Sequence, residues 1–501
     1  MNKSKIDKVL LIVPILVILL VCICLILNPE SSYTAIAALR NLVGDKLSSY
    51  YLVFGLLFVG IILFLSFSKY GKIRLGDKVE HSTFSWGAMI FTSTMAADIV
   101  YFSFHEWSYY FNGNPRGLES VGLVESQAWS ATYPLFHWGP IPWAFYIVPA
   151  IAYAYMMYVR KKNVHRISDA CEIKNKPLRF VIDIFAIIAL LAATSTTFSL
   201  ATPLMSEILC NVLGLGQNTA ILTVCILFLI AIIYTIAVIF DIKGISKLAS
   251  ICVYLFGALL VVVLCNSNLQ YTIETGLTGL GNMINNFVSL STETGSLRLV
   301  SSSGTTFTQD YTIFYWAYWI SWALATPFFI ARISRGRTIR QVALGAMIAG
   351  LLGTYASFIV FGNFGLYHQI AGNYDFLAAV ESGQSYASAI VGLLSTIPWS
   401  KVVMSLVFIS MTAFYASTFD ALTLVVAQYT CREYTETPPK SNRILWCVVL
   451  ILLPIALIFT GGTLESLQSL SIIAALPLSL IFLRVIYVFF KHMREGTRWK
   501  D

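Results

Sequence analysis

Charged residues are scarce in this sequence of 501 residues: Asp, Glu, Lys and Arg together make up 12% of it, whereas 57% of the residues are hydrophobic. An ordinary soluble domain carries roughly 25% charged residues. The mean hydropathy of +0.75 agrees with this shortage, and the composition excludes a chain built of soluble domains. Because a membrane-spanning helix needs roughly 20 apolar residues, the chain has room for about a dozen spans and none for a separate soluble domain.

The sequence also lacks the paired cysteine and histidine ligands of a metal site. Its nine cysteines are scattered, mostly inside apolar runs, and we interpret them as small packing residues. It shows no grouping of nucleophile, base and orienting residue that is typical of an enzyme, so we expect neither an enzyme nor a resident cofactor. The net charge of +8 does not indicate a nucleic-acid partner, because the Lys and Arg residues lie in short loops between apolar runs.

Apolar runs separated by polar connections predict twelve membrane-spanning helices. They begin near Val9, Tyr50, Phe84, Phe136, Phe180, Ala220, Leu248, Ile313, Val342, Lys401, Ile444 and Leu470. The first run follows three lysines but is too long for a typical cleaved signal peptide, so we expect an uncleaved first helix.

Lys and Arg are concentrated in every second connection. The basic segments are 69–78, 160–166, 243–247, 332–340, 432–443 and 491–500. The alternate connections are poorer in these residues, so the positive-inside rule places both termini in the cytoplasm. We therefore expect a multi-pass protein of the inner, or plasma, membrane.

Two predicted spans do not read as plain apolar helices. The third contains small and hydroxylated residues before Asp98, and the eighth contains Thr326-Pro327 after an aromatic stretch. Interrupted helices at matching places in two halves indicate inverted repeats with a binding site between them at the membrane midplane. The predicted single transporter domain has two N-terminal peripheral helices (1–79), a first repeat (80–266), an amphipathic external surface helix (267–312) and a second repeat (313–492).

Aromatic residues are unusually dense at the start of the fourth span, 136–146, and in the eighth, 315–322. A quaternary ammonium group has no N–H to donate, but aromatic faces attract it, each by about 0.5 to 2 kcal/mol. Several rings together could supply micromolar affinity. The alternative is an interfacial belt of Trp and Tyr. However, Tyr318, Trp319 and Trp322 lie several residues inside their span, which favours a site.

Residues 331–340, Ala-Arg-Ile-Ser-Arg-Gly-Arg-Thr-Ile-Arg, follow the aromatic run, and together they resemble the signature of the betaine/choline/carnitine transporter family. Four further segments, 136–140, 201–204, 431–433 and 499–501, are similar to the carnitine branch, so the resemblance covers nearly the whole chain. It implies an all-α integral membrane protein with twelve transmembrane helices, a LeuT-type core of two inverted five-helix repeats, and assembly as a homotrimer.

The resemblance also implies an aromatic substrate site. The positions of the family's aromatic box are occupied by Trp138, Trp143, Tyr146 and Trp319. Tyr318 and Trp322 match positions that line the transport path, and Tyr109 matches a further aromatic of the carnitine branch. Tyr318 stands where the family usually has Trp.

Asp98 departs from the betaine carriers of the family, whose third-span break is rich in glycine, and resembles the choline carriers. Betaine and carnitine bring their own carboxylate, whereas choline is a bare cation that a buried carboxylate would neutralise. An acid at membrane depth is a functional hypothesis by default. Asp98 is therefore a candidate substrate ligand and also a candidate carrier of a coupling proton; the alternative is a structural ion pair with another helix.

Sodium-coupled relatives hold the ion between the third-span break and the end of span ten. The matching residues here are Thr92, Met95, Phe414, Ser417 and Thr418. Their oxygens suit a hard cation, although hydroxyls in membrane helices also bond their own backbone. Sodium-independent exchangers carry Arg where Ser246 stands and Met where Thr326 stands, so symport with sodium or protons is favoured.

These features predict a secondary active symporter of a quaternary-ammonium compound, with choline as the favoured substrate and membrane lipid as its surroundings. Two alternatives stay open. One is a carnitine or glycine betaine carrier or exchanger of the same fold, and the other, from a different class, is a channel or osmosensing receptor.

Overall fold

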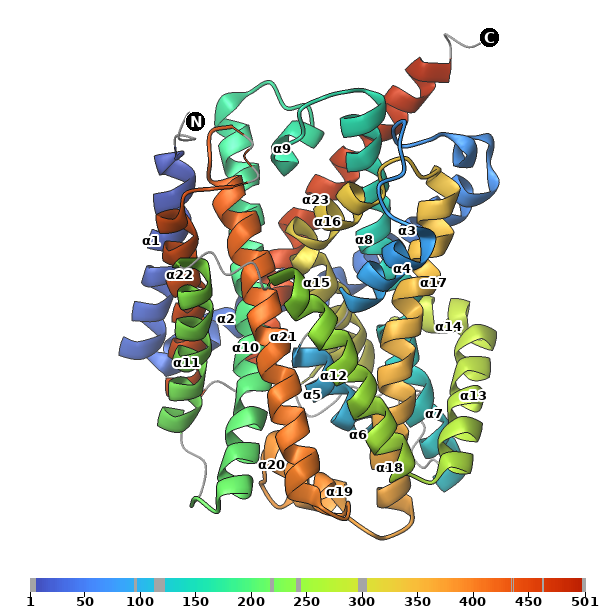
Figure 1. Ribbon diagram of the computed structural model, residues 1–501, viewed down its shortest axis with the longest axis vertical. Coiled ribbons are helices and arrows are strands. Elements are labelled where there is room, and N and C mark those ends of the chain that lie inside the picture. The colour runs from blue at the N-terminus through green and yellow to red at the C-terminus, as the bar shows by residue number, and fades with distance from the viewer. Residues whose placement is uncertain are drawn as a thin grey trace.

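The computed structural model is a bundle of helices. It describes residues 6–93, 97–111, 122–216, 220–239, 245–295, 304–433, 435, 437–461 and 464–497, and within these ranges it contains no β-strand. Figure 1 shows the long helices running beside one another along the longest axis of the molecule. The predicted all-α class is confirmed for this part of the chain.

The helices are named in chain order. The first half contains α1 (Lys8–Leu27), α2 (Pro29–Val43), α3 (Ser48–Phe67), α4 (Thr83–Thr92), α5 (Ala97–His105), α6 (Trp107–Phe111), α7 (Leu123–His137), α8 (Pro140–Ala154), α9 (Ile167–Ala170), α10 (Lys176–Leu213), α11 (Ala220–Ile239) and α12 (Ile245–Cys265). The second contains α13 (Leu269–Asn285), α14 (Phe287–Thr292), α15 (Ile313–Ser321), α16 (Thr326–Ile333), α17 (Ile339–Ser357), α18 (Asn363–Ile370), α19 (Phe376–Glu381), α20 (Tyr386–Leu394), α21 (Ser400–Tyr429), α22 (Lys440–Phe459) and α23 (Leu464–Thr497). Each predicted span start lies in one of these helices.

Eight of the described helices are long and apolar enough to cross a membrane, or up to ten if each of two bent pairs counts as one span. The predicted spans outside this number are α11, whose apolar part is short, and the divided pair α4 and α5. The count of twelve therefore stays a prediction.

The predicted interruption of the eighth span is present. The helical segments Thr308–Ser321 and Thr326–Ile333 are bent by 56° relative to each other, with a short 3-10 turn, Trp322–Leu324, in the gap. Pro327 lies in the first turn of α16, where its missing N–H costs no helical hydrogen bond. In the third predicted span, α4 ends at Thr92 and α5 begins at Ala97, and residues 94–96 lie outside the described residues, so this interruption stays a prediction.

The basic segments gather at one end of the molecule, as predicted. The N–H of Leu75 donates to the carbonyl of Arg337 at 2.8 Å. Arg166 donates to Asp7 Oδ2 at 3.3 Å and to the carbonyl of Cys431 at 2.7 Å. Figure 1 shows α1 beginning and α23 ending at this same end. Its assignment to the cytoplasm rests on the positive-inside rule and stays a prediction, and Lys243 lies outside the described residues.

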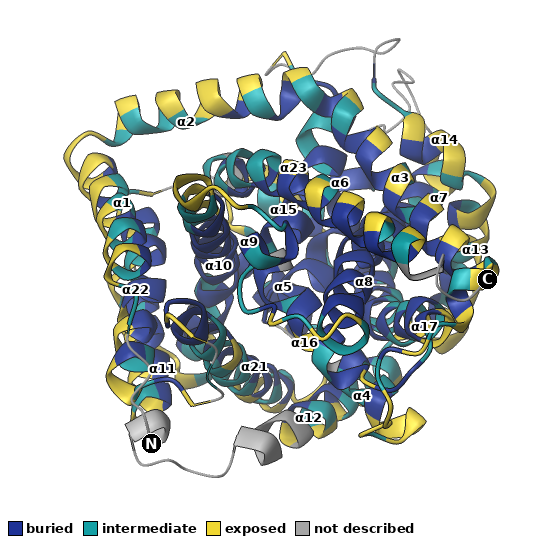
Figure 2. Cartoon of the chain, turned by 90° about the horizontal axis from the view of Figure 1, so that it is seen from above, coloured by how far each residue is buried: buried dark blue, intermediate teal, exposed yellow. Residues whose placement is uncertain are grey.

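The middle of the bundle is formed by α5, α8 and α15. Every residue of α5 and α15 is buried, and Figure 2 shows these helices surrounded by others whose outer faces are exposed. Those outer faces are strongly apolar: Leu16, Leu20 and Leu27 of α1 are between 58% and 78% exposed. Apolar exposed faces suit contact with lipid. The polar and aromatic residues lie on the central helices, away from it.

The predicted amphipathic segment 267–312 contains α13 and α14. The helical part of α12 is bent by 111° relative to α13. The inner face of α13 includes Gly279, where a Cβ would lie 2.7 Å from the carbonyl oxygen of Ala131 in α7, while Ile273 and Leu277 are at least half exposed. The segment is helical over Leu269–Asn285 and Phe287–Thr292. Its position at the outer membrane surface, and the division into two repeats, stay predictions.

Candidate functional site

A cavity of about 440 Å³ lies at the centre of the bundle. Its inner end is lined by all but one of the predicted substrate residues: Asp98, Trp138, Trp143, Tyr146, Tyr318, Trp319 and Trp322. From there it extends toward the basic end of the molecule, where Arg332 and Gln428 line it. The residues predicted from three separate spans are thus brought together around one space.

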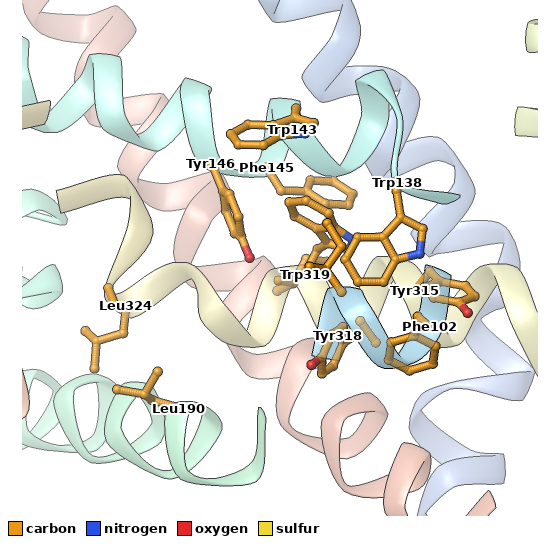
Figure 3. Packing of buried hydrophobic residues seen from close by; sticks show 14 of the residues in the cluster. Phe102, Trp138, Trp143, Phe145, Tyr146, Leu190, Tyr315, Tyr318, Trp319 and Leu324 are labelled. Atoms are coloured by element: carbon orange, nitrogen blue, oxygen red, sulfur yellow. The ribbon is translucent and has the colours of Figure 1, made fainter. Parts of the chain in front are cut away.

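Trp319 is the centre of the aromatic group. Its ring centroid lies 5.5 Å from that of Trp138, 5.7 Å from that of Trp143 and 4.9 Å from that of Tyr146. Trp138 and Trp143 meet Trp319 edge to face, at interplanar angles of 71° and 60°, and Tyr146 is tilted by 45°. Figure 3 shows Trp138, Trp143 and Tyr146 approaching Trp319 from α7 and α8. These four side chains are buried inside the protein, which argues against an interfacial belt of Trp and Tyr.

The joint between α7 and α8 explains how neighbouring residues reach one point. Trp138 follows the last residue of α7, and Pro140 begins α8. At Gly139 a Cβ would lie 2.4 Å from the carbonyl oxygen of Leu135, so the tight turn requires glycine. The carbonyl of Trp138 accepts a hydrogen bond from Thr354 Oγ1 at 3.0 Å. The break thus directs Trp138 toward the aromatics of α8.

Gly350 in α17 packs closely against the Trp143 indole. A Cβ at Gly350 would lie 2.4 Å from Cε2 of the Trp143 indole. Overpacking of this kind costs about 1 to 3 kcal/mol. We therefore expect Gly350→Ala to displace the indole and raise KM for uptake roughly tenfold. The matched control is Gly281→Ala, because nothing lies within 4 Å of that added Cβ. An unchanged KM in Gly350→Ala would contradict this role for Trp143.

Asp98 is buried at 5% exposure near the start of α5. Its carboxyl accepts hydrogen bonds from the hydroxyl of Tyr318, from Thr197 Oγ1 at 3.5 Å and from the N–H of Ile99 at 3.1 Å. Among the residues with described placement, no Lys or Arg forms an ion pair with it. The alternative of a structural ion pair therefore has no support, and the carboxyl is held by neutral groups at the wall of the cavity.

Tyr318 departs from the family's usual Trp in a way that fits Asp98. Its hydroxyl bonds both Asp98 and Thr197. A Trp at this position would have no hydroxyl, and its N–H would lie elsewhere on the ring. The acid and the tyrosine thus form one unit in this chain.

Glu106 is a site residue that was not predicted. Its side chain is fully buried. One carboxyl oxygen accepts from Trp138 Nε1 at 2.7 Å and the other from the Tyr110 hydroxyl at 2.7 Å. Tyr110 also bonds His137 Nδ1 at 2.7 Å. The available signal was a second acid in the third predicted span, eight residues after Asp98.

Tyr109 is the predicted substrate residue that does not line the cavity. Its hydroxyl lies 2.9 Å from His105 Nε2. Its ring packs against Tyr311 and Tyr386, with centroids 5.3 Å away in each case. The structure therefore places Tyr109 in a neighbouring aromatic cluster.

The predicted cation ligands are only partly brought together. Ser417 and Thr418 of α21 line the cavity that Asp98 also lines. Phe414 is buried one turn earlier, against Phe256. Thr92 is the last residue of α4, and Met95 lies outside the described residues.

Polar residues surround the far end of the cavity. His165 Nε2 lies 2.7 Å from the carbonyl oxygen of Gln428, and Arg332 donates to Gln428 Oε1 at 3.4 Å. Burial lowers the pKa of His165, although its bond to Gln428 opposes the shift. An imidazole and a guanidinium therefore border the opening.

Comparison with known proteins finds one family along nearly the whole chain. The model of the betaine/carnitine/choline transporter family matches residues 9–498. A carnitine transporter of Acinetobacter baumannii is 29% identical over 97% of this chain and 88% of its own length. In Acinetobacter baylyi, a glycine betaine transporter is 29% identical over 96% of this chain and 72% of its own. An osmo-dependent choline transporter of that organism is 27% identical over 98% of this chain and 72% of its own length.

The match spans nearly the whole described bundle, including the broken helices and the central cavity. The relatives carry different quaternary amines, so they establish the class of protein without selecting one substrate. The chain is a membrane transporter and belongs to the betaine/carnitine/choline transporter family.

Proposed function

We propose that this transporter is a symporter whose substrate is choline or a close quaternary amine. The observation that carries this proposal is the position of Asp98, which lines the same cavity as the four aromatic rings and is bonded by neutral groups. Rings attract the methylated nitrogen, and the carboxylate balances its charge. A zwitterionic substrate would not need this acid.

The proposed transport cycle uses the two broken helices. The substrate sits beside Trp319, between the third, fourth and eighth predicted spans, and access alternates as the bundle with the broken helices moves against the scaffold. Ser417 and Thr418 are proposed to hold sodium, and Asp98 is the candidate carrier if a proton is used instead. The homotrimer expected from the family stays part of this proposal.

Competition for uptake of labelled choline tests the substrate. We expect unlabelled choline to compete strongly, and carnitine and glycine betaine to compete weakly. A strong preference for the two zwitterions would instead establish the carnitine or betaine alternative. Uptake that does not saturate and needs no ion gradient would contradict a carrier altogether.

Glu106 is proposed as a positioning residue for Trp138. A buried indole N–H left without an acceptor costs about 1 to 3 kcal/mol, so this bond can fix the indole orientation inside the bundle. Glu106→Leu should raise the choline KM at least about tenfold. Glu106→Gln should recover part of this loss, because an amide oxygen can still accept one of the two bonds. A wild-type KM for folded Glu106→Leu would remove Glu106 from this role.

Sodium coupling is tested in proteoliposomes with imposed gradients. Ser417→Ala combined with Thr418→Val should lower the apparent sodium affinity at least about tenfold, because two oxygen ligands are lost. Ser405→Ala is the matched control, since Ser405 lies on the same helix but does not line the cavity. Uptake driven equally well by sodium in the double variant would contradict this site, and uptake driven by a proton gradient alone would assign the coupling to protons.

A further inference from the structure

A basic depression lies between the start of α10 and the end of α23, away from the central cavity. Its charged lining consists of Glu172, Lys174, Lys176, Arg179, Arg484 and Lys491. Five cations thus face one acid in a single hollow at the basic end of the molecule. We define these residues as the basic pocket.

The single acid does not neutralise the pocket. Glu172 is already bonded by Lys162 and by His492 Nε2, the latter at 2.7 Å. Arg179 is paired with Asp169. Lys174, Lys176 and Lys491 are exposed, and among the described residues no ion pair engages them. Three positive charges are therefore available to an anion from outside.

The start of α10 adds to this positive field. Asn175 caps the helix by accepting from the N–H of Leu178 at 3.1 Å. Partial positive charge gathers at a helix N-terminus and favours phosphate groups there. Lys176 is the first residue of the helix, so its charge and the helix terminus lie together.

One face of α23 leads from the apolar part of the bundle to the pocket. Leu480, Arg484, Tyr487 and Lys491 are spaced by four, three and four residues and share one side of the helix. Leu480 is 53% exposed and Tyr487 is 59% exposed. The Arg484 guanidinium lies over the Tyr487 ring, 5.1 Å from its centroid. Moving along this face, an apolar side chain is followed by aromatic and cationic groups, which is the order of environments across a membrane interface.

We propose that the basic pocket binds the phosphate of an anionic phospholipid, whose acyl chains lie along the exposed face of α23. A phospholipid and free phosphate would both present a phosphate anion to these lysines. A lipid is favoured over free phosphate because the apolar end of the face extends away from the pocket into the membrane region. Each lysine near a membrane surface contributes about 1 kcal/mol toward anionic lipid, so removal of three should weaken binding on the order of 100-fold.

The test uses the full chain, purified in detergent. Thermal unfolding is followed with phosphatidylglycerol, with phosphatidylethanolamine of the same acyl chains, or with inorganic phosphate. Ligand binding to the folded state raises the midpoint, so we expect phosphatidylglycerol alone to raise it by a few degrees. In Lys174→Gln/Lys176→Gln/Lys491→Gln the rise should fall to the phosphatidylethanolamine value. The matched control, Lys69→Gln/Lys72→Gln/Lys78→Gln, removes the same charge from exposed lysines outside the pocket and should keep the full rise.

Native mass spectrometry of single variants provides a second measurement. Lys174→Gln and Lys491→Gln should each retain less phosphatidylglycerol than the wild type. The proposal is overturned if the triple variant keeps the full thermal shift, if the control variant loses as much as the triple variant, or if inorganic phosphate alone reproduces the effect. The last result would assign the pocket to a free anion.

Discussion

Trp319→Leu is expected to reduce choline uptake at least about 30-fold. Trp319 is in contact with Trp138, Trp143 and Tyr146. Removing it eliminates one cation–π contact of about 2 kcal/mol in a desolvated site, and it also frees the other rings to move. The measurement is initial uptake rate against choline concentration in proteoliposomes. Trp319→Phe should lie between the wild type and Trp319→Leu, because a smaller ring is kept.

Loss of a buried tryptophan also destabilises a protein, so the control must share that cost. Trp446 of α22 is fully buried but does not line the cavity. Trp446→Leu should lower stability to a similar extent and leave KM unchanged once uptake is normalised to folded protein. If Trp446→Leu and Trp319→Leu raised KM equally, the aromatic group would have a packing role only.

Asp98→Asn is expected to weaken choline on the order of 100-fold while leaving glycine betaine nearly unchanged. A carboxylate and a cation about 4 Å apart attract each other by several kcal/mol at an intermediate dielectric, and each 1.4 kcal/mol is tenfold in affinity. Betaine supplies its own carboxylate and loses less. Asp98→Gly should act in the same direction. The ratio of inhibition constants for choline and betaine is the measurement.

Tyr318→Phe separates the charge of Asp98 from its orientation. This variant keeps a ring in the cavity wall but removes the hydroxyl that bonds the carboxyl. We expect a smaller loss of choline affinity than in Asp98→Asn, because the charge remains. An unchanged choline-to-betaine ratio in Asp98→Asn would remove this acid from the substrate site.

The sequence indicated which aromatic residues gather around the cavity, because they occur as dense runs inside apolar spans. Periodicity and breaker residues also located the gap between α15 and α16, where Thr326-Pro327 ends one helical path and begins another. Such features are local, so a reading along the chain can detect them.

What could not be predicted depends on contacts between distant segments. The bond from Trp138 to Glu106 joins residues 32 positions apart, and the one from Tyr318 to Asp98 joins residues 220 apart. Neither has a periodic signal. Tyr109 illustrates the converse: its position matched an aromatic of the carnitine branch, yet its hydroxyl faces His105. Side-chain direction follows from packing, which a motif does not specify.

The central claim is that rings and a carboxylate recognise the positive charge of a methylated nitrogen. Binding of labelled choline to the purified protein should therefore be measured against unlabelled choline and against 3,3-dimethylbutan-1-ol, which replaces the ammonium nitrogen by carbon and has the same shape without the charge. The account predicts that the neutral analogue competes at least about 100-fold more weakly. Equal competition by the two compounds would show that shape alone is recognised and would contradict the account.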